Sequence, residues 1–283
     1  MVKKLALNGL ASLLFIVSSG QNILANDNSN IKVVGEKQVT WVNLVSTSNN
    51  FNKSQKKYSV AVFSGHVSKG NNEYSNQGAL SYTKKREFEY NDELVKEFAN
   101  LNKDGIEYTL YLATEDIALS KRVALAKLNG ANLYLELHHD STENSIIYKL
   151  KKEGDSKSSW ENYEGFSVFY NPNINNSKNS IEAILSRNIA EEMLKLNRKP
   201  NLSHAKFESN KRNLIDDALG IYDGSFLQVL KSQAMPTILF ECGSIVSPHE
   251  EKVHSDSDFH RKIAEKIHSA VVRLKEKLKE EKE

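Results

Sequence analysis

The chain has 283 residues, of which 39% are hydrophobic, four are prolines and one is a cysteine; this length and composition suit one α/β domain with additions. Its 38 basic and 36 acidic residues give a formal net charge of +2, a balance that gives no reason to expect nucleic acid as a partner. The single cysteine, Cys242, excludes a disulfide bond within the chain.

The first 25 residues have the layout of a secretory signal peptide. Lys3 and Lys4 precede an apolar run over residues 5–17, and small and polar residues follow it. This run is shorter than the roughly 20 apolar residues that a membrane span needs, and a retained N-terminal anchor is the alternative. Cleavage after Ala25 would leave 36 basic and 36 acidic residues. We expect the mature protein to be exported and not integral to the membrane, with the periplasm as its location and secretion or the cell surface as alternatives.

Residues 26–56 are predicted to form an N-terminal appendage and a linker. Two short β-rich runs, at 31–34 and 39–45, are followed by a stretch rich in Asn and Ser at 46–54. After the linker, apolar strands alternate with amphipathic helices, which is typical of βαβ units. We therefore predict one main domain over residues 57–283.

The predicted strands are short and apolar at both odd and even positions, which suits strands covered on both faces. They span residues 58–63, 108–112, 132–137, 166–170 and 237–241. The predicted helices carry apolar residues at helical spacing and span residues 92–102, 118–129, 181–196 and 259–278. Asn91 is expected to cap the first helix, and Gly130 follows the second. The predicted fold class is α/β, with a largely parallel or mixed twisted sheet flanked by helices.

Four residues that are remote in sequence follow predicted strands or precede a predicted helix: His66, Glu87, His138 and Glu241. In open α/β sheets, ligands bind outside the carboxyl ends of the strands. Gly65 would permit a tight turn that presents His66. We therefore expect the four side chains to converge at one edge of the sheet.

Two neutral imidazoles and one carboxylate form a suitable set of ligands for Zn²⁺ and leave a fourth position open, as hydrolytic zinc sites require. Zinc lowers the pKa of bound water to about 7, so hydroxide is available at neutral pH. A second carboxylate, not bound to the metal, can take a proton and return it to an amine leaving group. Glu241 suits this role. We predict one zinc ion per chain at the carboxyl ends of the strands.

The residues around these four positions resemble a known family. They comprise Gly65-His66, the segment 87–91, residues 119–122, the segment 135–141, and residues 236–243 with 248–250. In this order they resemble the zinc-dependent N-acetylmuramoyl-L-alanine amidases of amidase family 3, and the resemblance covers roughly residues 58–274.

The resemblance implies a role for each of the four residues. In the family, zinc is bound by a Gly-His loop, a glutamate four residues before an asparagine, and a histidine that closes a strand; these match His66, Glu87 and His138. The glutamate after a strand that begins with proline is the catalytic acid/base and matches Glu241. The implied reaction is hydrolysis of the amide between N-acetylmuramic acid and L-alanine of the stem peptide. The implied partners are peptidoglycan or muropeptides, with room for a protein activator.

The chain departs from the family pattern around these residues. Of the family's Asp-Pro-Gly-His-Gly-Gly run it keeps only Gly65-His66. Glu241 is followed by Cys242-Gly243-Ser244, where the family has Val-Gly-Phe. We expect these changes to affect substrate preference more than the reaction.

Neighbouring residues offer alternatives at the site. Glu89 competes with Glu87 for the metal, and the spacing to Asn91 favours Glu87. His139 is expected on the opposite side of the strand in a supporting role, with replacement of His138 as the alternative.

Three further residues are interpreted as supporting ones. Glu136 has the strand parity of His138 and is expected either to orient a ligand or to be a peripheral charge. Strand alternation sends Cys242 to the opposite face, where we expect an inert buried thiol, with a nucleophile as the alternative. Arg122 is interpreted as a structural or surface cation outside the site.

Two other classes of function stand beside the zinc amidase. One is a noncatalytic peptidoglycan-binding or regulatory protein on an amidase scaffold, and the other is a related zinc carboxypeptidase or amidohydrolase. Two long connections, residues 143–163 and 197–223, are candidates for occluding the site until a partner binds. The second contains His204, Glu208 and Arg212.

Overall fold

The computed structural model describes residues 22–25, 30–35, 38–43, 57–69, 77–174, 177, 179–209, 211–232 and 234–281. The chain divides into two compact units, Met1–Gln55 and Lys56–Glu283.

The first unit contains a small antiparallel sheet of three strands in chain order: β1 (Asn22–Ala25), β2 (Asn30–Gly35) and β3 (Gln38–Asn43). The two predicted β-rich runs coincide with β2 and β3. Residues 1–21, which make up most of the predicted signal peptide, lie outside the described residues, so the signal peptide stays a prediction. The same holds for the predicted linker up to residue 56.

The second unit is built on a mixed sheet of seven strands in the order β5-β4-β6-β10-β7-β9-β8. The strands are β4 (Tyr58–Ser64), β5 (Ile106–Tyr111), β6 (Leu133–Asp140), β7 (Ser167–Tyr170), β8 (Leu214–Asp216), β9 (Ile221–Asp223) and β10 (Thr237–Ser244). β5, β4, β6 and β10 run parallel, whereas β7 is antiparallel to β10 and β8 is antiparallel to β9. The predicted mixed α/β sheet is thus confirmed.

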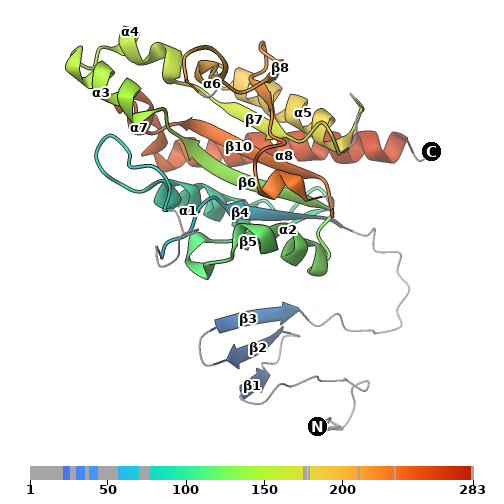
Figure 1. The fold of residues 1–283 in the computed structure, drawn as a ribbon. Helices are drawn as coiled ribbons and strands as arrows, with labels where there is room; N and C mark the ends of the chain where they lie inside the picture. Colours follow the sequence, from blue (N-terminus) through green and yellow to red (C-terminus); the bar gives the residue numbers. More distant parts are fainter. Residues whose placement is uncertain are drawn as a thin grey trace, which may run out of the picture. The chain divides into compact units, whose positions relative to one another are not determined.

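Helices cover both faces of this sheet (Figure 1). They are α1 (Glu87–Glu97), α2 (Leu119–Leu128), α3 (Asn144–Lys152), α4 (Lys157–Trp160), α5 (Ile181–Lys195), α6 (Ser203–Lys206), α7 (Pro248–His254) and α8 (Ser257–Glu280), with 3₁₀ turns η1 (Phe98–Asn100), η2 (Ala113–Glu115), η3 (Glu161–Tyr163) and η4 (Val229–Lys231). Side chains of α1, α5 and α8 pack into the larger hydrophobic core on one face. Side chains of α2 and η4 pack into a second core on the other face.

Alternation along β6 sends successive side chains to these two cores. Leu133, Leu135 and Leu137 join the core of α1, α5 and α8, whereas Tyr134 joins the core of α2. A strand places residues i and i+2 on the same face. The adjacent residues His138 and His139 are therefore directed to opposite faces.

β6 and β10 extend further than the sequence predicts, because both continue past the residue expected to end them. His138 and Glu241 accordingly lie within strands. In the parallel pairing of the two strands, Glu241 is the partner of His138, and the register becomes irregular between Glu241 and Ser244. Paired residues of neighbouring strands stand side by side on one face, so Glu241 is directed to the face of His138.

The first large helix begins earlier than predicted. α1 starts at Glu87 and not near Asp92, and Asn91 is fully buried within the helix. The backbone N–H of Arg86 donates to the Glu89 carboxylate at 2.8 Å, which satisfies a polar group at the start of the helix without an Asn cap. Glu87 is therefore the first residue of α1.

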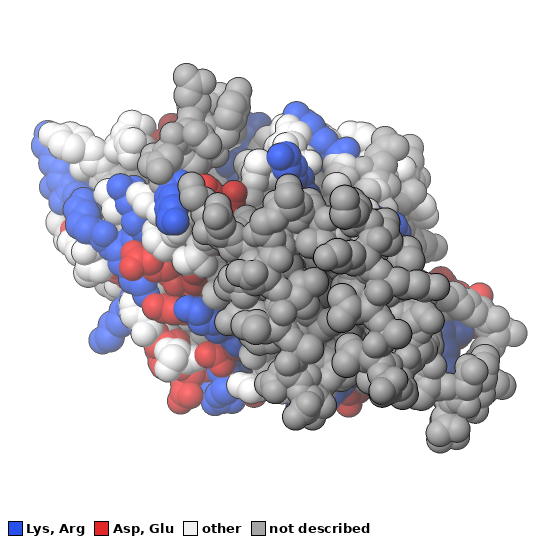
Figure 2. Space-filling model, turned by 90° about the horizontal axis from the view of Figure 1, so that it is seen from below, with Lys and Arg blue, Asp and Glu red and all other residues white. Residues whose placement is uncertain are grey.

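The surface of the second unit carries both signs of charge. Basic and acidic side chains lie beside one another on the coloured part of the face in Figure 2. Among the residues that the structure describes, no helix has the length and apolarity that crossing a membrane requires.

Candidate active site

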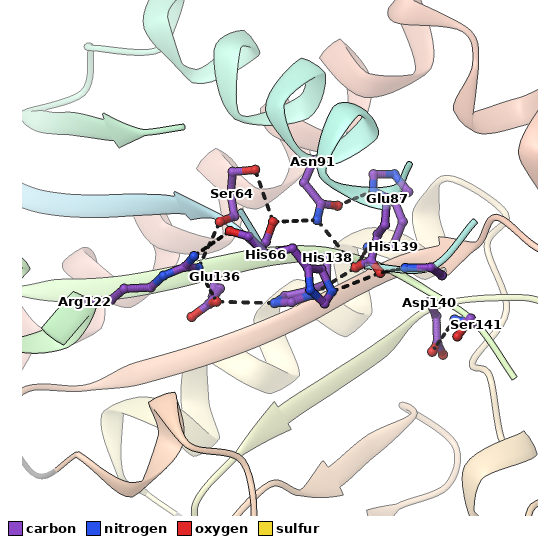
Figure 3. Close-up of polar contacts among 12 residues, drawn as sticks. Ser64, His66, Glu87, Asn91, Arg122, Glu136, His138, His139, Asp140 and Ser141 are labelled. Atoms are coloured by element: carbon purple, nitrogen blue, oxygen red, sulfur yellow. Dashed lines mark hydrogen bonds and ion pairs between the residues drawn. The ribbon is translucent and has the colours of Figure 1, made fainter. Parts of the chain in front are cut away.

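Three of the predicted site residues meet at the carboxyl ends of β4 and β6 (Figure 3). His66 follows β4, Glu87 opens α1, and His138 lies on β6. The two oxygens of Glu87 each face one histidine, with 3.0 Å from Oε2 to His66 Nε2 and 3.0 Å from Oε1 to His138 Nδ1. One ligand atom from each residue lies within 4.8 Å of the others, so the three could hold one metal ion.

Glu87, and not Glu89, faces the two histidines. Glu87 is 4% exposed, and its Oε2 also accepts a hydrogen bond from the backbone N–H of Ala79 at 2.9 Å. Burial opposes ionisation of this carboxyl, but His66 and His138 outweigh burial and lower its pKa well below the usual value. Glu89 is occupied at the start of α1 by the backbone of Arg86. The geometry thus favours Glu87 as a metal ligand.

The backbone that presents His66 differs from the predicted turn. The left-handed conformation falls on His66 itself, with φ of 67°, and not on Gly65. Glycine is required at position 65 for another reason: a Cβ atom there would overlap the ring of His138. A left-handed non-glycine residue stores strain of about 1–3 kcal/mol, which persists where the surroundings enforce it.

Arg122 enforces this conformation from inside the protein. Its guanidinium donates to the carbonyl oxygens of Ser64 and His66, at 3.0 and 2.5 Å, and to Glu136 Oε1 at 2.7 Å. Arg122 is 2% exposed, so its reading as a surface cation is wrong and its structural reading holds. No local pattern predicts these contacts, because the partners lie 14 to 58 residues away.

Glu136 connects Arg122 to His138. Its Oε1 lies 3.4 Å from His138 Nε2, and its Oε2 accepts a hydrogen bond from the Tyr134 hydroxyl at 2.5 Å. Burial raises the pKa of Glu136, but the charge of Arg122 and the contact with His138 outweigh it and hold the pKa at about 2. Glu136 is thus a buried carboxylate that orients His138, and the reading as a peripheral charge is wrong.

Glu241 stands beside His138 across the β6–β10 pair. Its Oε2 is buried without a hydrogen-bond partner among the residues that the structure describes. Burial, which outweighs the attraction of His138, raises the pKa of Glu241 to about 8. A carboxyl group in this state can hold or release a proton near neutral pH.

Cys242 and His139 lie on the opposite face, as strand alternation predicts. Cys242 is 1% exposed within the core of α1, α5 and α8, and burial raises the pKa of its thiol well above the usual value. This thiol has the surroundings of an inert core residue. The ring of His139 contacts Asn91 Oδ1 at 2.7 Å, and this contact holds it away from the pair of His66 and Glu87.

The connection from residue 197 to residue 223 has secondary structure of its own, because it contains α6 and the edge strands β8 and β9. His204 on α6 is 1% exposed. Its Nε2 lies 2.6 Å from Asp140 Oδ2, and its Nδ1 lies 3.0 Å from Glu208 Oε1. Burial lowers the pKa of His204, but Asp140 and Glu208 outweigh burial and raise it to about 9. The sequence singled out His204 and Glu208 but offered no way to pair them with Asp140.

A sequence model of amidase family 3, described as N-acetylmuramoyl-L-alanine amidase, matches residues 60–273. The chain belongs to this family. The expected resemblance is thereby confirmed over most of the second unit, and the enzyme class is that of an N-acetylmuramoyl-L-alanine amidase acting on peptidoglycan. Among curated proteins, none matches the sequence.

Solved structures of amidases share the fold. N-acetylmuramoyl-L-alanine amidase from Clostridium difficile 630 has a TM-score of 0.54 and 22% identity over 77% of this chain and 96% of that chain. The catalytic domain of CwlV from Bacillus (Paenibacillus) polymyxa var. colistinus has a TM-score of 0.53 and 17% identity, covering 76% and 96%. The apo form of Ami1 from Mycobacterium abscessus has a TM-score of 0.55 and 13% identity, covering 76% and 97%. At these identities the likeness shows the fold alone.

Proposed function

We propose that this amidase is exported, depends on zinc, and hydrolyses the amide between N-acetylmuramic acid and L-alanine of the stem peptide. His66, Glu87 and His138 would bind the ion, and Glu241 would be the catalytic acid/base. The observation that carries the proposal is the meeting of two imidazoles and one ionised carboxylate next to a second carboxyl whose pKa is shifted in the opposite direction.

The donor set fits zinc. Two histidine nitrogens and one carboxylate oxygen are the ligands of several hydrolytic zinc sites, which keep a fourth position open. Zinc held there would polarise the scissile carbonyl and lower the pKa of water to about 7. The surroundings of His138 also suit a zinc ligand. A histidine that binds zinc usually bonds through its other ring nitrogen to a carboxylate, a backbone carbonyl or water, and Glu136 Oε1 lies 3.4 Å from His138 Nε2.

The chain's own residues divide the remaining work. The buried Oε2 of Glu241 has no hydrogen-bond partner among the described residues, so it is free to accept a proton from water and return it to the departing alanine amine. Arg122 and Glu136 hold the backbone of His66 and the ring of His138 in place. Such fixed positions matter because misplacement of a reacting group by about 1 Å can cost on the order of 100-fold in rate.

Digestion of purified sacculi tests the reaction and the metal together. We expect the purified protein to release intact stem peptides that begin with L-alanine, as mass spectrometry of the products would show. A chelator should abolish release, and added Zn²⁺ should restore it. Cleavage within the stem peptide would indicate a carboxypeptidase instead. Binding to sacculi without release in the presence of Zn²⁺ would indicate a noncatalytic protein and contradict the proposal.

Export is tested by the N-terminus of the protein found in cells. The apolar run after Lys3 and Lys4 supports a cleaved signal peptide, and a family that acts on peptidoglycan works outside the cytoplasm. We expect mass spectrometry to find Asn26 as the first residue of protein recovered from the periplasm. An intact N-terminus on cytoplasmic protein would rule out this location.

Occlusion of the site by one of two segments is a separate hypothesis. The segments are in contact: the backbone N–H of Ser209 donates to Glu143 Oε1 at 2.6 Å, and the rings of Tyr163 and Phe207 lie 5.7 Å apart. The second segment also reaches the end of β6, since the hydroxyl of Thr142 donates to Glu208 Oε1 at 3.1 Å. Shortening α3 and α4 should raise basal amidase activity if this layer occludes the site. Unchanged activity in a folded variant would exclude occlusion by residues 143–163, and the same test on residues 197–223 would decide for the second segment.

A further inference from the structure

Three buried histidines lie on the face of β6 opposite the candidate zinc site: His139 on β6, His254 at the end of α7 and His260 in α8. We refer to them as the three-histidine cluster. Each is at most 1% exposed, and one ring nitrogen of each lies within 4.8 Å of the others. Buried nitrogens without partners cost about 1–3 kcal/mol each, so this arrangement requires a physical cause.

The hydrogen bonds of Asn91 fix the protonation of His139 (Figure 3). The amide nitrogen of Asn91 donates to the carbonyl oxygen of Gly65 at 3.2 Å, so its Oδ1 is the atom that faces His139 Nδ1 at 2.7 Å. An amide oxygen can only accept, and His139 Nδ1 therefore carries the proton. His139 Nε2 then presents a lone pair toward His254. A histidine held at one nitrogen in this way is oriented as metal ligands usually are.

Hydrogen bonding alone leaves a conflict at His254. Its Nδ1 lies 3.0 Å from His139 Nε2, and its Nε2 lies 3.8 Å from Glu250 Oε2. If Nδ1 carries the proton, Nε2 directs a lone pair toward a carboxylate. If Nε2 carries the proton, the lone pairs of His139 and His254 face each other across 3.0 Å. A cation between the two rings removes the second conflict and leaves His254 Nε2–H directed at Glu250.

His260 offers a third nitrogen that could bind a metal ion. Its Nε2 is buried and has no hydrogen-bond partner in the part of the chain that the structure describes. Burial and the neighbouring His254 lower the pKa of His260 to about 3, so its ring is neutral at physiological pH. A neutral imidazole is the form that binds metals.

We propose that the three-histidine cluster is a second metal site, which binds a late first-row divalent cation and Zn²⁺ in particular. Imidazole ligands suit Zn²⁺, Cu²⁺ and Ni²⁺. Zn–N bonds of about 2.0–2.1 Å in tetrahedral geometry put ligand nitrogens about 3.4 Å apart. The His139–His254 pair, at 3.0 Å, is near this spacing, and a ring nitrogen of His260 lies within 4.8 Å of the other two ligand atoms.

The second site would have a structural role. It joins β6, α7 and α8 behind the catalytic face, and Asn91 connects it to Glu87, whose Oε1 lies 3.5 Å from the Asn91 amide nitrogen. The carboxylate of Glu250, which is also paired with Arg198, would orient the ring of His254. The ion would thus stabilise the backbone that carries His138 without contacting substrate.

Counting metal in matched variants tests the proposal. Metal would be removed from the full chain with a chelator, Zn²⁺ alone would be added back, and excess zinc would be removed. Elemental mass spectrometry would then give the number of zinc ions per chain. We expect two zinc ions per wild-type chain and one in His260→Leu. In the His66→Ala background, which lacks the first site, we expect one zinc ion, and none once His260→Leu is added. His268→Leu is the matched control, because His268 is also buried on α8 but bonds to Tyr108 and Asp104. It should leave the count unchanged.

A second measurement leaves all three histidines intact and so does not depend on the folding of His260→Leu. Co²⁺ added to the His66→Ala variant should give the visible absorption of a tetrahedral ion. No loss of zinc with His260→Leu in either background, an equal loss with His268→Leu, or absence of the Co²⁺ band would each overturn the second site. Amidase activity of the zinc-loaded wild type is unaffected by these outcomes, so the failure of this proposal is distinguishable from failure of the proposed function.

Discussion

His138 and His139 are neighbours in sequence, yet the two faces of β6 give them opposite surroundings. On the face of His138, burial lowers the pKa of the imidazole, but the neighbouring carboxyl groups of Glu241, Glu136 and Glu87 outweigh burial and raise this pKa well above its usual value. On the other face, burial and the neighbouring rings of His254 and His260 lower the pKa of His139 well below the usual value. Carboxyl groups are therefore the main neighbours of the His138 ring, and we call this the charged face. Imidazole rings are the main neighbours of the His139 ring, and we call this the neutral face.

The two faces therefore suit different roles: the charged face suits a reaction, and the neutral face suits a rigid support behind it. The charged face reaches solvent through His66, whose side chain is 21% exposed, and it contains a carboxyl group with a pKa of about 8. The neutral face is closed by α7 and α8. A reaction needs groups that reach solvent and exchange protons, as on the charged face. A fixed backbone behind the reacting groups needs a closed core, as on the neutral face.

The largest expected effect is on the charged face. Glu241→Gln should lower amide hydrolysis by about 10²–10⁴-fold, because it removes a group that accepts and returns a proton, while zinc stays bound. His138→Ala should lose both zinc and hydrolysis. Cys242→Ala, one residue along β10 and on the other face, is the control and should keep its activity. Hydrolysis and metal content measured on the same samples would decide; full activity of either active-site variant contradicts the assignment.

The next effect is on stability. Arg122→Met should cost about 3–5 kcal/mol, because it leaves the buried carboxylate of Glu136 without its cation. Urea unfolding measures the loss. The double variant Arg122→Met/Glu136→Gln should recover part of it, since no unpaired charge then remains. A single variant as stable as wild type would show that the pair does not hold the charged face together.

The pH dependence of stability should differ between the two faces. His204, which neighbours the charged face, has its pKa raised from 6.5 to about 9. Its protonated form is stabilised by folding, so its contribution, on the order of 3 kcal/mol, is present below pH 6.5 and lost as pH rises through 9. Urea unfolding midpoints across alkaline pH should fall in wild type and stay flatter in His204→Gln.

His260 on the neutral face should act with the opposite sign. Its pKa is lowered from 6.5 to about 3 by burial and by His254. The neutral ring is stabilised by folding, so in metal-free protein its contribution is present above pH 6.5 and lost as pH falls toward 3. His260→Leu should flatten the acid limb of the same midpoint curve. An acid limb unchanged by this substitution would remove the distinction between the faces.

The smallest expected effect is at Asn91, which connects the faces. Asn91→Ala should cost about 1–3 kcal/mol, because His139 loses its buried partner, and about 10–100-fold in metal affinity or activity. Asn188→Ala is the matched control: Asn188 is buried and donates to the carbonyl oxygen of Ala270 at 3.2 Å on α8. It should lose stability alone. Equal losses of activity in both variants would mean that Asn91 has no special link to the site.

Patterns local in sequence predicted the main strands and the faces to which their residues are directed. Short apolar runs located all five expected strands, and four residues that follow strands or precede the first helix indicated where a site would form. Strand parity also placed His139 and Cys242 on the face away from His138. These inferences succeed because strand period and the carboxyl-end rule depend on a few adjacent residues.

Features that depend on distant partners were out of reach. Asn91 looked like a helix cap, but the Glu89 carboxylate serves the helix start and frees Asn91 for the core. His254 lies 115 residues from His139, so no spacing could reveal the three-histidine cluster. The start of α7 does follow a local pattern, since Ser247 caps the helix and Pro248 is its first residue, but α7 is absent from the predicted helices. The three-residue strands β8 and β9 carry too few residues to show a period.

The parallel register of β6 and β10 sets the distance between His138 and Glu241, the proposed metal ligand and the proposed acid/base. Backbone hydrogen bonds hold the strands about 4.8 Å apart, so the distance from His138 to Glu241 is fixed by strand pairing and not by the length of any loop. Insertions in the loops that connect the strands leave this distance unchanged. A slip of β10 by one residue would bring Phe240 or Cys242 beside His138 and turn Glu241 into the apolar core. Loops around the site can thus diverge in sequence and change what is cut, while the strands keep constant how it is cut.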